Sequence, residues 1–151
     1  MAEWTGGCAC GTVRYRLNSA PYDAGWCHCR TCQLNSGAPA MAFATVPFDD
    51  YEIVEGKSSV RRFASSGFGW RIFCGACGTP LGMHVQHQPD TIDFSVTTLD
   101  GPERLPPTFH IFYASRIPWA EACDDKPRHD RFRPDTRGLD RTEPPQQTPL
   151  P

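Results

Sequence analysis

Short runs of apolar residues recur along most of the chain, and turn-forming residues separate them. Residues 12–17 alternate apolar and basic side chains, the two-residue period of a half-buried strand. Residues 19–26 predict a turn and a short approach to the cysteines at 27–32, and residues 30–36 predict about two helical turns, ended by Gly37 and Pro39. Runs rich in aromatic and β-branched residues predict further strands at 41–46, 51–54, 60–64, 69–73, 81–86, 92–97 and 108–113. Short strands at this spacing predict stacked antiparallel sheets with one short helix, a mainly β fold.

The predicted core and the predicted domain boundary follow from the same pattern. Phe43, Phe63 and Phe94 lie in predicted strands and are expected in the core. Beyond about Ala120 the chain is charged and rich in proline, with few apolar residues. Such a composition buries too little apolar surface to offset chain entropy. We therefore expect a domain over 4–120 and a charged, proline-rich tail over 121–151 that is at least partly disordered, above all over 135–151.

Length and charge exclude several classes of protein. The 151 residues suffice for one domain with a real core. With 15 Lys and Arg against 17 Asp and Glu, nothing in the charge balance favours binding to nucleic acid or to an anionic membrane. The chain has no run of about 18 apolar residues to span a bilayer, and its first residues lack the pattern of a secretory signal. We therefore expect a cytoplasmic protein.

In a reducing compartment, the cysteine pattern favours metal binding over disulfides. Seven of the eight cysteines lie in C-x-C or C-x-x-C spacings. Two of these pairs are each followed by a glycine, Gly11 or Gly78, which permits a left-handed backbone and lets main-chain N–H groups point at sulfur. Four thiolates complete a structural zinc site, and here the metal would join two hairpins distant in sequence. The predicted ligands of this site are Cys8, Cys10, Cys74 and Cys77.

The remaining cluster, Cys27, Cys29 and Cys32, offers three thiolates within six residues. Three ligands leave the fourth zinc position open, as in catalytic sites, so that a substrate thiol or water can bind there and lose its proton. Water, His28 or Cys123 are the alternatives that would close this position passively. We expect His28 to orient the loop and Cys123 to be a free thiol.

These cysteines, with Phe109-His110-Ile111 and Ser115-Arg116-x-Pro118-Trp119, resemble the glutathione-dependent formaldehyde-activating enzyme family, which shares a superfamily with the centromere protein V domain. The resemblance covers about residues 4–119. It implies a β-tent fold related to zinc ribbons, with two zinc ions per chain. The structural ion would bind Cys8, Cys10, Cys74 and Cys77, and the catalytic one Cys27, Cys29 and Cys32. The implied activity is that of a carbon–sulfur lyase, which condenses glutathione with formaldehyde to S-(hydroxymethyl)glutathione.

The sequence also gives expectations for four residues outside the cysteine clusters, and it leaves other functions open. Arg30 and Arg71 are candidates for binding the carboxylates of glutathione, with solvated arginines as the alternative. His110 and Trp119 are expected to pack and hydrogen-bond on the last strand. The alternative functions are a carrier of the thiol adduct, a non-catalytic zinc module for protein interaction, and a redox sensor that uses the three central cysteines.

Overall fold

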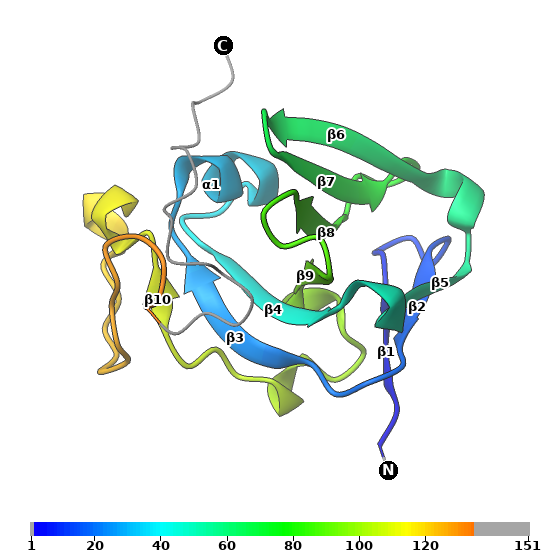
Figure 1. Ribbon diagram of the computed structural model, residues 1–151, viewed down its shortest axis with the longest axis horizontal. Coiled ribbons are helices and arrows are strands. Elements are labelled where there is room, and N and C mark those ends of the chain that lie inside the picture. The colour runs from blue at the N-terminus through cyan, green and yellow to red at the C-terminus, as the bar shows by residue number, and fades with distance from the viewer. Residues whose placement is uncertain (1, 135–151) are drawn as a thin grey trace.

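The computed structural model describes residues 2–134, and these form two β-sheets and one short helix. The smaller sheet is antiparallel, with the order β1-β2-β5. The larger sheet has seven strands in the order β10-β3-β4-β9-β8-β7-β6 (Figure 1). The strands are β1 (Trp4–Gly7), β2 (Arg14–Leu17), β3 (Tyr22–Cys27), β4 (Met41–Pro47), β5 (Tyr51–Glu55), β6 (Val60–Ser66), β7 (Gly69–Cys74), β8 (Pro80–Val85), β9 (Thr91–Ser95) and β10 (His110–Ile111).

Most elements lie where the hydrophobic pattern predicts them, and the mainly β class is confirmed. Helix α1 (Arg30–Ser36) has the predicted bounds, and it ends at Gly37 in the left-handed conformation. The last strand is shorter than predicted, because only His110 and Ile111 pair, and they pair in parallel with β3. The expectation of purely antiparallel sheets is therefore wrong at this edge.

The sequence pattern does not predict two of the strands, β1 and β3. The prediction of a turn over 19–26 is wrong, because residues 22–27 form β3, which pairs with β4 on one side and β10 on the other. Its Asp23-Ala24-Gly25 stretch has low strand propensity, so tertiary pairing decides the conformation. Strand β1 contains Gly6, where a Cβ would clash with the ring of Tyr15. Glycine therefore permits close packing here and does not break the strand.

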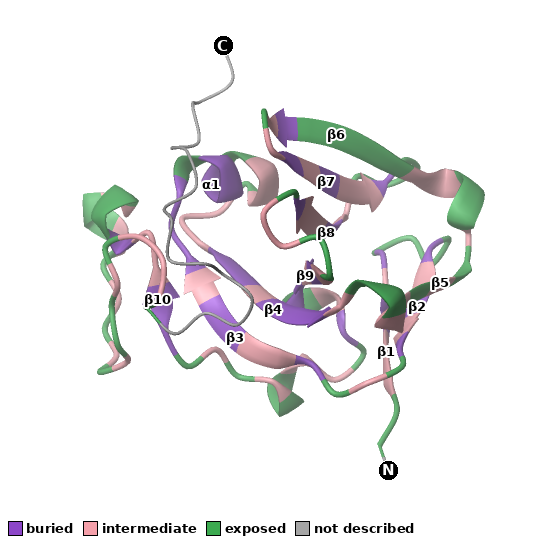
Figure 2. Cartoon of the chain, viewed as in Figure 1, coloured by how far each residue is buried: buried purple, intermediate pink, exposed green. Residues whose placement is uncertain are grey.

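The core lies where the two sheets pack against each other, and Figure 2 shows its buried residues along β3 and β4. Tyr15 stacks on Tyr51, and the ring of Phe94 packs against both. Phe94 is fully buried as predicted, whereas Phe43 is half-buried beside the Cys27 cluster. The prediction that Phe63 lies in the core is wrong. Phe63 is 44% exposed because β6 is an edge strand of the large sheet.

The chain beyond residue 120 continues to pack against the domain as far as residue 134. His110 N donates to Pro127 O (2.8 Å), and His129 N donates back to His110 O (2.9 Å). In Figure 1 this segment (orange) lies beside β10. The packed body thus extends past the boundary expected at residue 120, and the tail over 135–151 lies outside the described residues.

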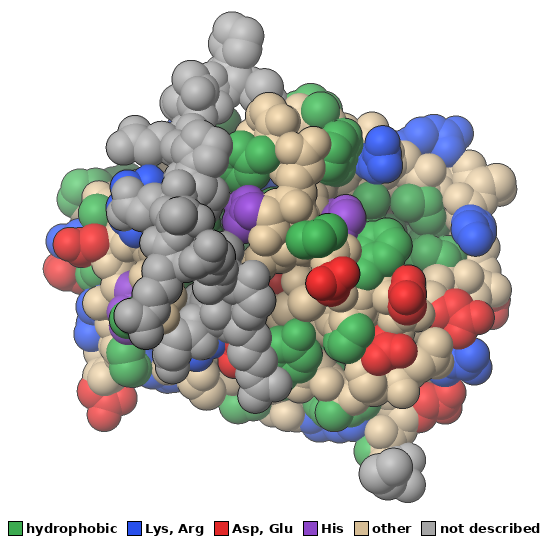
Figure 3. Space-filling model, in the orientation of Figure 1, with side chains coloured by type: hydrophobic (Ala, Val, Ile, Leu, Met, Phe, Trp, Pro, Cys, Tyr) green, Lys and Arg blue, Asp and Glu red, His purple; other side chains and the backbone are tan. Residues whose placement is uncertain are grey.

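Two observations concern the surface and membranes. On the face shown in Figure 3, acidic and basic side chains both occur and are scattered among polar and apolar ones. Over residues 2–134, no helix is both long and apolar enough to cross a membrane.

Candidate metal and substrate site

The predicted four-cysteine site assembles from two turns that are distant in sequence. Cys8 and Cys10 lie in the β1–β2 connection, and Cys74 and Cys77 lie at the β7–β8 turn. The four sulfur atoms lie within 4.8 Å of one another, with Cys8 and Cys10 at 3.5 Å and Cys10 and Cys74 at 3.9 Å. Tetrahedral Zn–S bonds of ~2.3 Å place sulfur atoms about 3.8 Å apart, so the cluster fits a zinc ion.

The local backbone explains why each pair converges. Gly11 and Gly78 both adopt left-handed conformations, with φ of 78° and 79°, as the sequence predicts. Gly11 N donates to Cys8 O at 3.0 Å, and Gly78 N donates to Cys74 O at 2.7 Å, which makes two equivalent turns. The Val13 N–H donates to Cys8 Sγ at 3.2 Å, which stabilises a thiolate there.

The three-cysteine cluster forms where β3 meets α1. Cys27 ends β3, Cys29 caps the N-terminus of α1, and Cys32 lies in the first turn of the helix. Cys32 N donates to Cys29 Sγ at 3.3 Å, so the spacing of three residues also serves the helix cap. All three cysteines are buried, and their sulfur atoms lie within 4.8 Å of one another. Within the described part of the chain, this group has no fourth protein ligand.

Neither of the two protein side chains considered as alternative fourth ligands joins this cluster. Cys123 is exposed and lies outside both clusters. His28 is buried, and its Nε2 lies 2.8 Å from His110 Nδ1, while His110 Nε2 lies 3.1 Å from the Asp124 carboxylate. Burial, with the charge of His110 beside it, lowers the pKa of His28 to about 4. His28 therefore anchors the loop through a chain of hydrogen bonds.

His110 and Trp119 have different surroundings. His110 is buried in β10 and hydrogen-bonded, as predicted. Trp119 is 78% exposed, in a 3₁₀ turn at Pro118–Ala120 that lies outside both sheets. The expectation that Trp119 packs on the last strand is therefore wrong.

The structure brings one of the two candidate arginines into the site. Arg71 on β7 is 1% exposed, and its guanidinium donates to Cys32 Sγ at 3.3 Å and to Ser65 Oγ at 3.4 Å. Hydrogen bonds from the Cys27 and Cys29 thiols, together with the charge of Arg71, lower the pKa of Cys32 well below its usual range. Arg71 is thus buried and hydrogen-bonded to the cluster. This placement fits neither of the two expectations for it, a solvated arginine or a receptor for a substrate carboxylate. Arg30 is exposed, and its guanidinium donates to Gln33 Oε1 at 3.4 Å.

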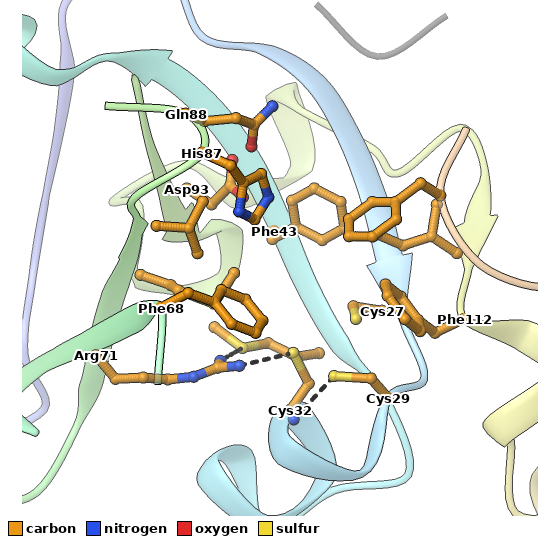
Figure 4. A pocket seen from close by; sticks show the side chains of 15 residues that line it. Cys27, Cys29, Cys32, Phe43, Phe68, Arg71, His87, Gln88, Asp93 and Phe112 are labelled. Atoms are coloured by element: carbon orange, nitrogen blue, oxygen red, sulfur yellow. Dashed lines mark hydrogen bonds between the residues drawn. The ribbon is translucent and has the colours of Figure 1, made fainter. Parts of the chain in front are cut away.

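The three sulfur atoms open onto a cavity of about 60 Å³. Figure 4 shows Arg71 and Cys32 on one side of this cavity and His87, Gln88 and Asp93 on another. Most of the wall is apolar, from Met41, Phe43, Phe68, Met83, Val85, Ile111, Phe112 and Phe132. The arrangement can hold a metal ion at the thiols and a small apolar group beside it.

Asp93 and Phe132 are residues of this cavity that the sequence analysis missed. Asp93 occupies the middle of strand β9, between Ile92 and Phe94, and accepts a hydrogen bond from Thr45 Oγ1 at 2.7 Å. Phe132 stands between two arginines in the stretch expected to be a charged, proline-rich tail. A carboxylate between two apolar residues of a strand and a single aromatic residue in a charged segment were the available signals.

Comparison with known proteins agrees with this geometry. The family model described as "Glutathione-dependent formaldehyde-activating enzyme" matches residues 3–115. An uncharacterised lyase of Schizosaccharomyces pombe is 35% identical over 81 residues, which cover 54% of this chain and 57% of that protein. A crystal structure of a Rhodobacter sphaeroides protein superposes with a TM-score of 0.54 and 25% identity, over 64% of this chain and 88% of that one. With its two cysteine clusters and its family match over residues 3–115, this chain belongs to the glutathione-dependent formaldehyde-activating enzyme family.

Proposed function

We propose that the protein is a zinc-dependent carbon–sulfur lyase that joins a thiol to formaldehyde at Cys27, Cys29 and Cys32, as S-(hydroxymethyl)glutathione synthase does. The observation that carries the proposal is the set of three buried thiols facing a cavity, with no fourth protein ligand among residues 2–134. The family description names glutathione and formaldehyde, and the S. pombe relative is named a lyase, which supports this reaction class.

The chemistry follows from the donor set and its neighbours. Cys27, Cys29 and Cys32 would hold the zinc ion, which would supply an open coordination position at which a thiol could lose its proton near neutral pH. The thiol sulfur forms a bond to the formaldehyde carbon as the carbonyl π bond breaks, and the proton leaves sulfur and ends on the new hydroxyl oxygen. The guanidinium of Arg71 offsets the negative charge of the cluster at Cys32.

Asp93 is the candidate to move that proton within the cavity. Burial raises the pKa of Asp93 to about 6, against the lowering effect of the Thr45 hydrogen bond. A carboxyl group with this pKa can both accept and return a proton near neutral pH.

The same shift gives a prediction for stability. The pKa of Asp93 is about 6 in the fold against an ordinary value of 3.8 for an aspartate side chain, so the folded state binds more protons between these pH values. The contribution of this group to stability is therefore greatest below pH 3.8 and is lost as the pH rises through 6. An asparagine side chain at this position keeps an acceptor for Thr45 without this titration. We expect Asp93→Asn to gain about 1 to 2 kcal/mol relative to wild type between pH 5 and pH 8, measured by urea unfolding. A constant difference across this range would contradict the prediction.

The test of the proposed reaction is exchange NMR with ¹³C-formaldehyde and a thiol. Glutathione and ethanethiol are each measured with and without zinc-loaded protein, because the adduct also forms without a catalyst. Exchange accelerated by the protein for either thiol supports the proposal. Bound thiol with no acceleration would contradict it in favour of a carrier of the adduct.

A further inference from the structure

His28 lies between two of the three cysteines, on the opposite face of the chain. The backbone is extended here, since β3 ends at Cys27 and Cys29 has a φ of −64° and a ψ of 151°. Successive side chains of an extended chain point to opposite faces. Cys27 and Cys29 accordingly line the cavity, whereas the ring of His28 packs on Tyr113. The position of His28 therefore sets the direction of both neighbouring sulfur atoms.

The backbone and the ring of His28 are both held in place. His28 N donates to Ile111 O at 3.1 Å, and His28 O accepts from Gln33 Nε2 at 2.8 Å. The buried ring meets that of Tyr113 edge to face, with centroids 5.0 Å apart. The rotation of the ring then depends on the hydrogen bonds at its two nitrogen atoms.

Asp124 fixes the direction of the hydrogen bonds that run through His110 to His28. An ionised carboxylate only accepts, so His110 Nε2, 3.1 Å from both carboxylate oxygens, carries a proton. Neutral His110 then accepts at Nδ1, and His28 Nε2 donates to it at 2.8 Å. This leaves His28 Nδ1 as a bare acceptor, buried without a partner among the described residues. The opposite direction would leave an unpaired N–H there, which is rarer in buried positions.

The carboxylate comes from the segment 121–134, which lies beyond the family match over 3–115. Lys126 N donates to Asp124 Oδ1 at 3.0 Å, and Ala122 N donates to Tyr113 Oη at 3.1 Å. With the backbone bonds to β10 described above, these contacts hold the segment against the domain. The segment thus presents a fixed acceptor on the side of the loop that carries the His28 ring.

We propose that Asp124 is a positioning residue for the metal site at the three cysteines, and that it acts through His110 and His28. By fixing the His28 ring, it holds the sulfur atoms of Cys27 and Cys29 toward the cavity before a metal ion binds. Outer groups that orient metal ligands contribute about 10- to 100-fold to metal affinity. The inference rests on the metal binding that the proposed function requires, and not on the proposed reaction.

Zinc release to a chromophoric chelator measures this role without turnover. We expect two phases, one for each cysteine cluster, and the phase of the three-cysteine site is the one that Cys29→Ser lacks. Asp124→Ala should accelerate this phase at least about tenfold and leave the other unchanged. The Asp124 side chain is 29% exposed, so the variant should fold, and the unchanged phase reports that it has. Asp125→Ala is the matched control, because it truncates the neighbouring exposed aspartate and should match wild type in both phases.

Nitrogen-15 NMR of the histidine rings gives a second readout, which a general loss of stability would not reproduce. In wild type, both His28 and His110 should carry the proton on Nε2. Asp124→Asn keeps an acceptor oxygen of the same reach. It should therefore retain both tautomers and release zinc at a rate closer to that of wild type than to that of Asp124→Ala.

Four results would overturn the proposal. They are a proton on Nδ1 of either histidine in wild type, an unchanged three-cysteine phase in Asp124→Ala, equal acceleration of both phases, and release from Asp124→Asn as fast as from Asp124→Ala. A wild-type protein with no phase that depends on Cys29 would contradict the metal site, and with it the proposed function. Selective acceleration in Asp124→Ala, beside absent turnover of every thiol by wild type, contradicts the reaction alone.

Discussion

The Cys29→Ser variant should stay folded, bind one zinc ion per chain against the two expected for wild type, and lose acceleration of thiol–formaldehyde exchange. Cys29 Sγ accepts from Cys32 N as the cap of α1, and a serine hydroxyl is a good helix cap. A serine hydroxyl is not deprotonated near neutral pH, and oxygen is a poorer partner than thiolate for this zinc site. The substitution therefore removes the metal from the cavity while it preserves the local hydrogen bond.

Three measurements check this result: zinc content by native mass spectrometry, thermal unfolding by circular dichroism, and the exchange experiment described above. Stability is expected to change by about 1 kcal/mol or less apart from the contribution of the lost zinc. Cys123→Ser is the matched control, since it replaces an exposed thiol outside both clusters and should match wild type in all three. Undiminished exchange in Cys29→Ser would rule out these thiols as the reaction centre.

The same substitution at Cys77 is expected to unfold the domain or to destabilise it severely. Cys77 belongs to a group of cysteines from the β1–β2 connection and the β7–β8 turn, so a metal ion held there would join the small sheet to the large one. Hydrogen bonds from Thr79 lower the pKa of Cys77 to about 5, which prepares this thiolate for a metal. Because structural zinc binding is coupled to folding, loss of the site should cost more than about 4 kcal/mol.

We expect the thermal midpoint of Cys77→Ser to fall by more than about 10 °C, with loss of the structural zinc. Cys123→Ser again gives the reference for a cysteine-to-serine change. A Cys77→Ser protein with wild-type stability would show that the four-cysteine group does not hold the sheets together. Equal loss of fold in Cys29→Ser and Cys77→Ser would contradict the division between a reactive and a structural site.

Much of the fold and both cysteine clusters could be predicted because their signals are local. Runs rich in aromatic and β-branched residues, bounded by turn residues, identified most strands, and Gly37 fixed the end of α1. C-x-C and C-x-x-C spacings followed by glycine specify turns in which the sulfur atoms of a pair converge, whatever the rest of the chain does.

The errors concern residues whose environment depends on distant partners. Strand β3 forms because β4 and β10 pair with it, although Asp23 and Gly25 disfavour a strand. Phe63 is a large apolar residue of the kind found in cores. It is nevertheless exposed, because the strand order of the large sheet places β6 at the edge. Arg71 looks like a surface arginine in the sequence and is buried because its cross-sheet position faces Cys32.

The sequence by itself determined the class of fold, the grouping of seven cysteines in two clusters, and the family. Each of these depends on residue types and on their spacing over short stretches of the chain. Only the tertiary structure decided what surrounds the three-cysteine cluster. Arg71 from β7, Asp93 from β9 and Phe132 from beyond the family match reach one cavity of about 60 Å³. Such a cavity depends on which strands become neighbours, and long-range pairing leaves no period in the chain.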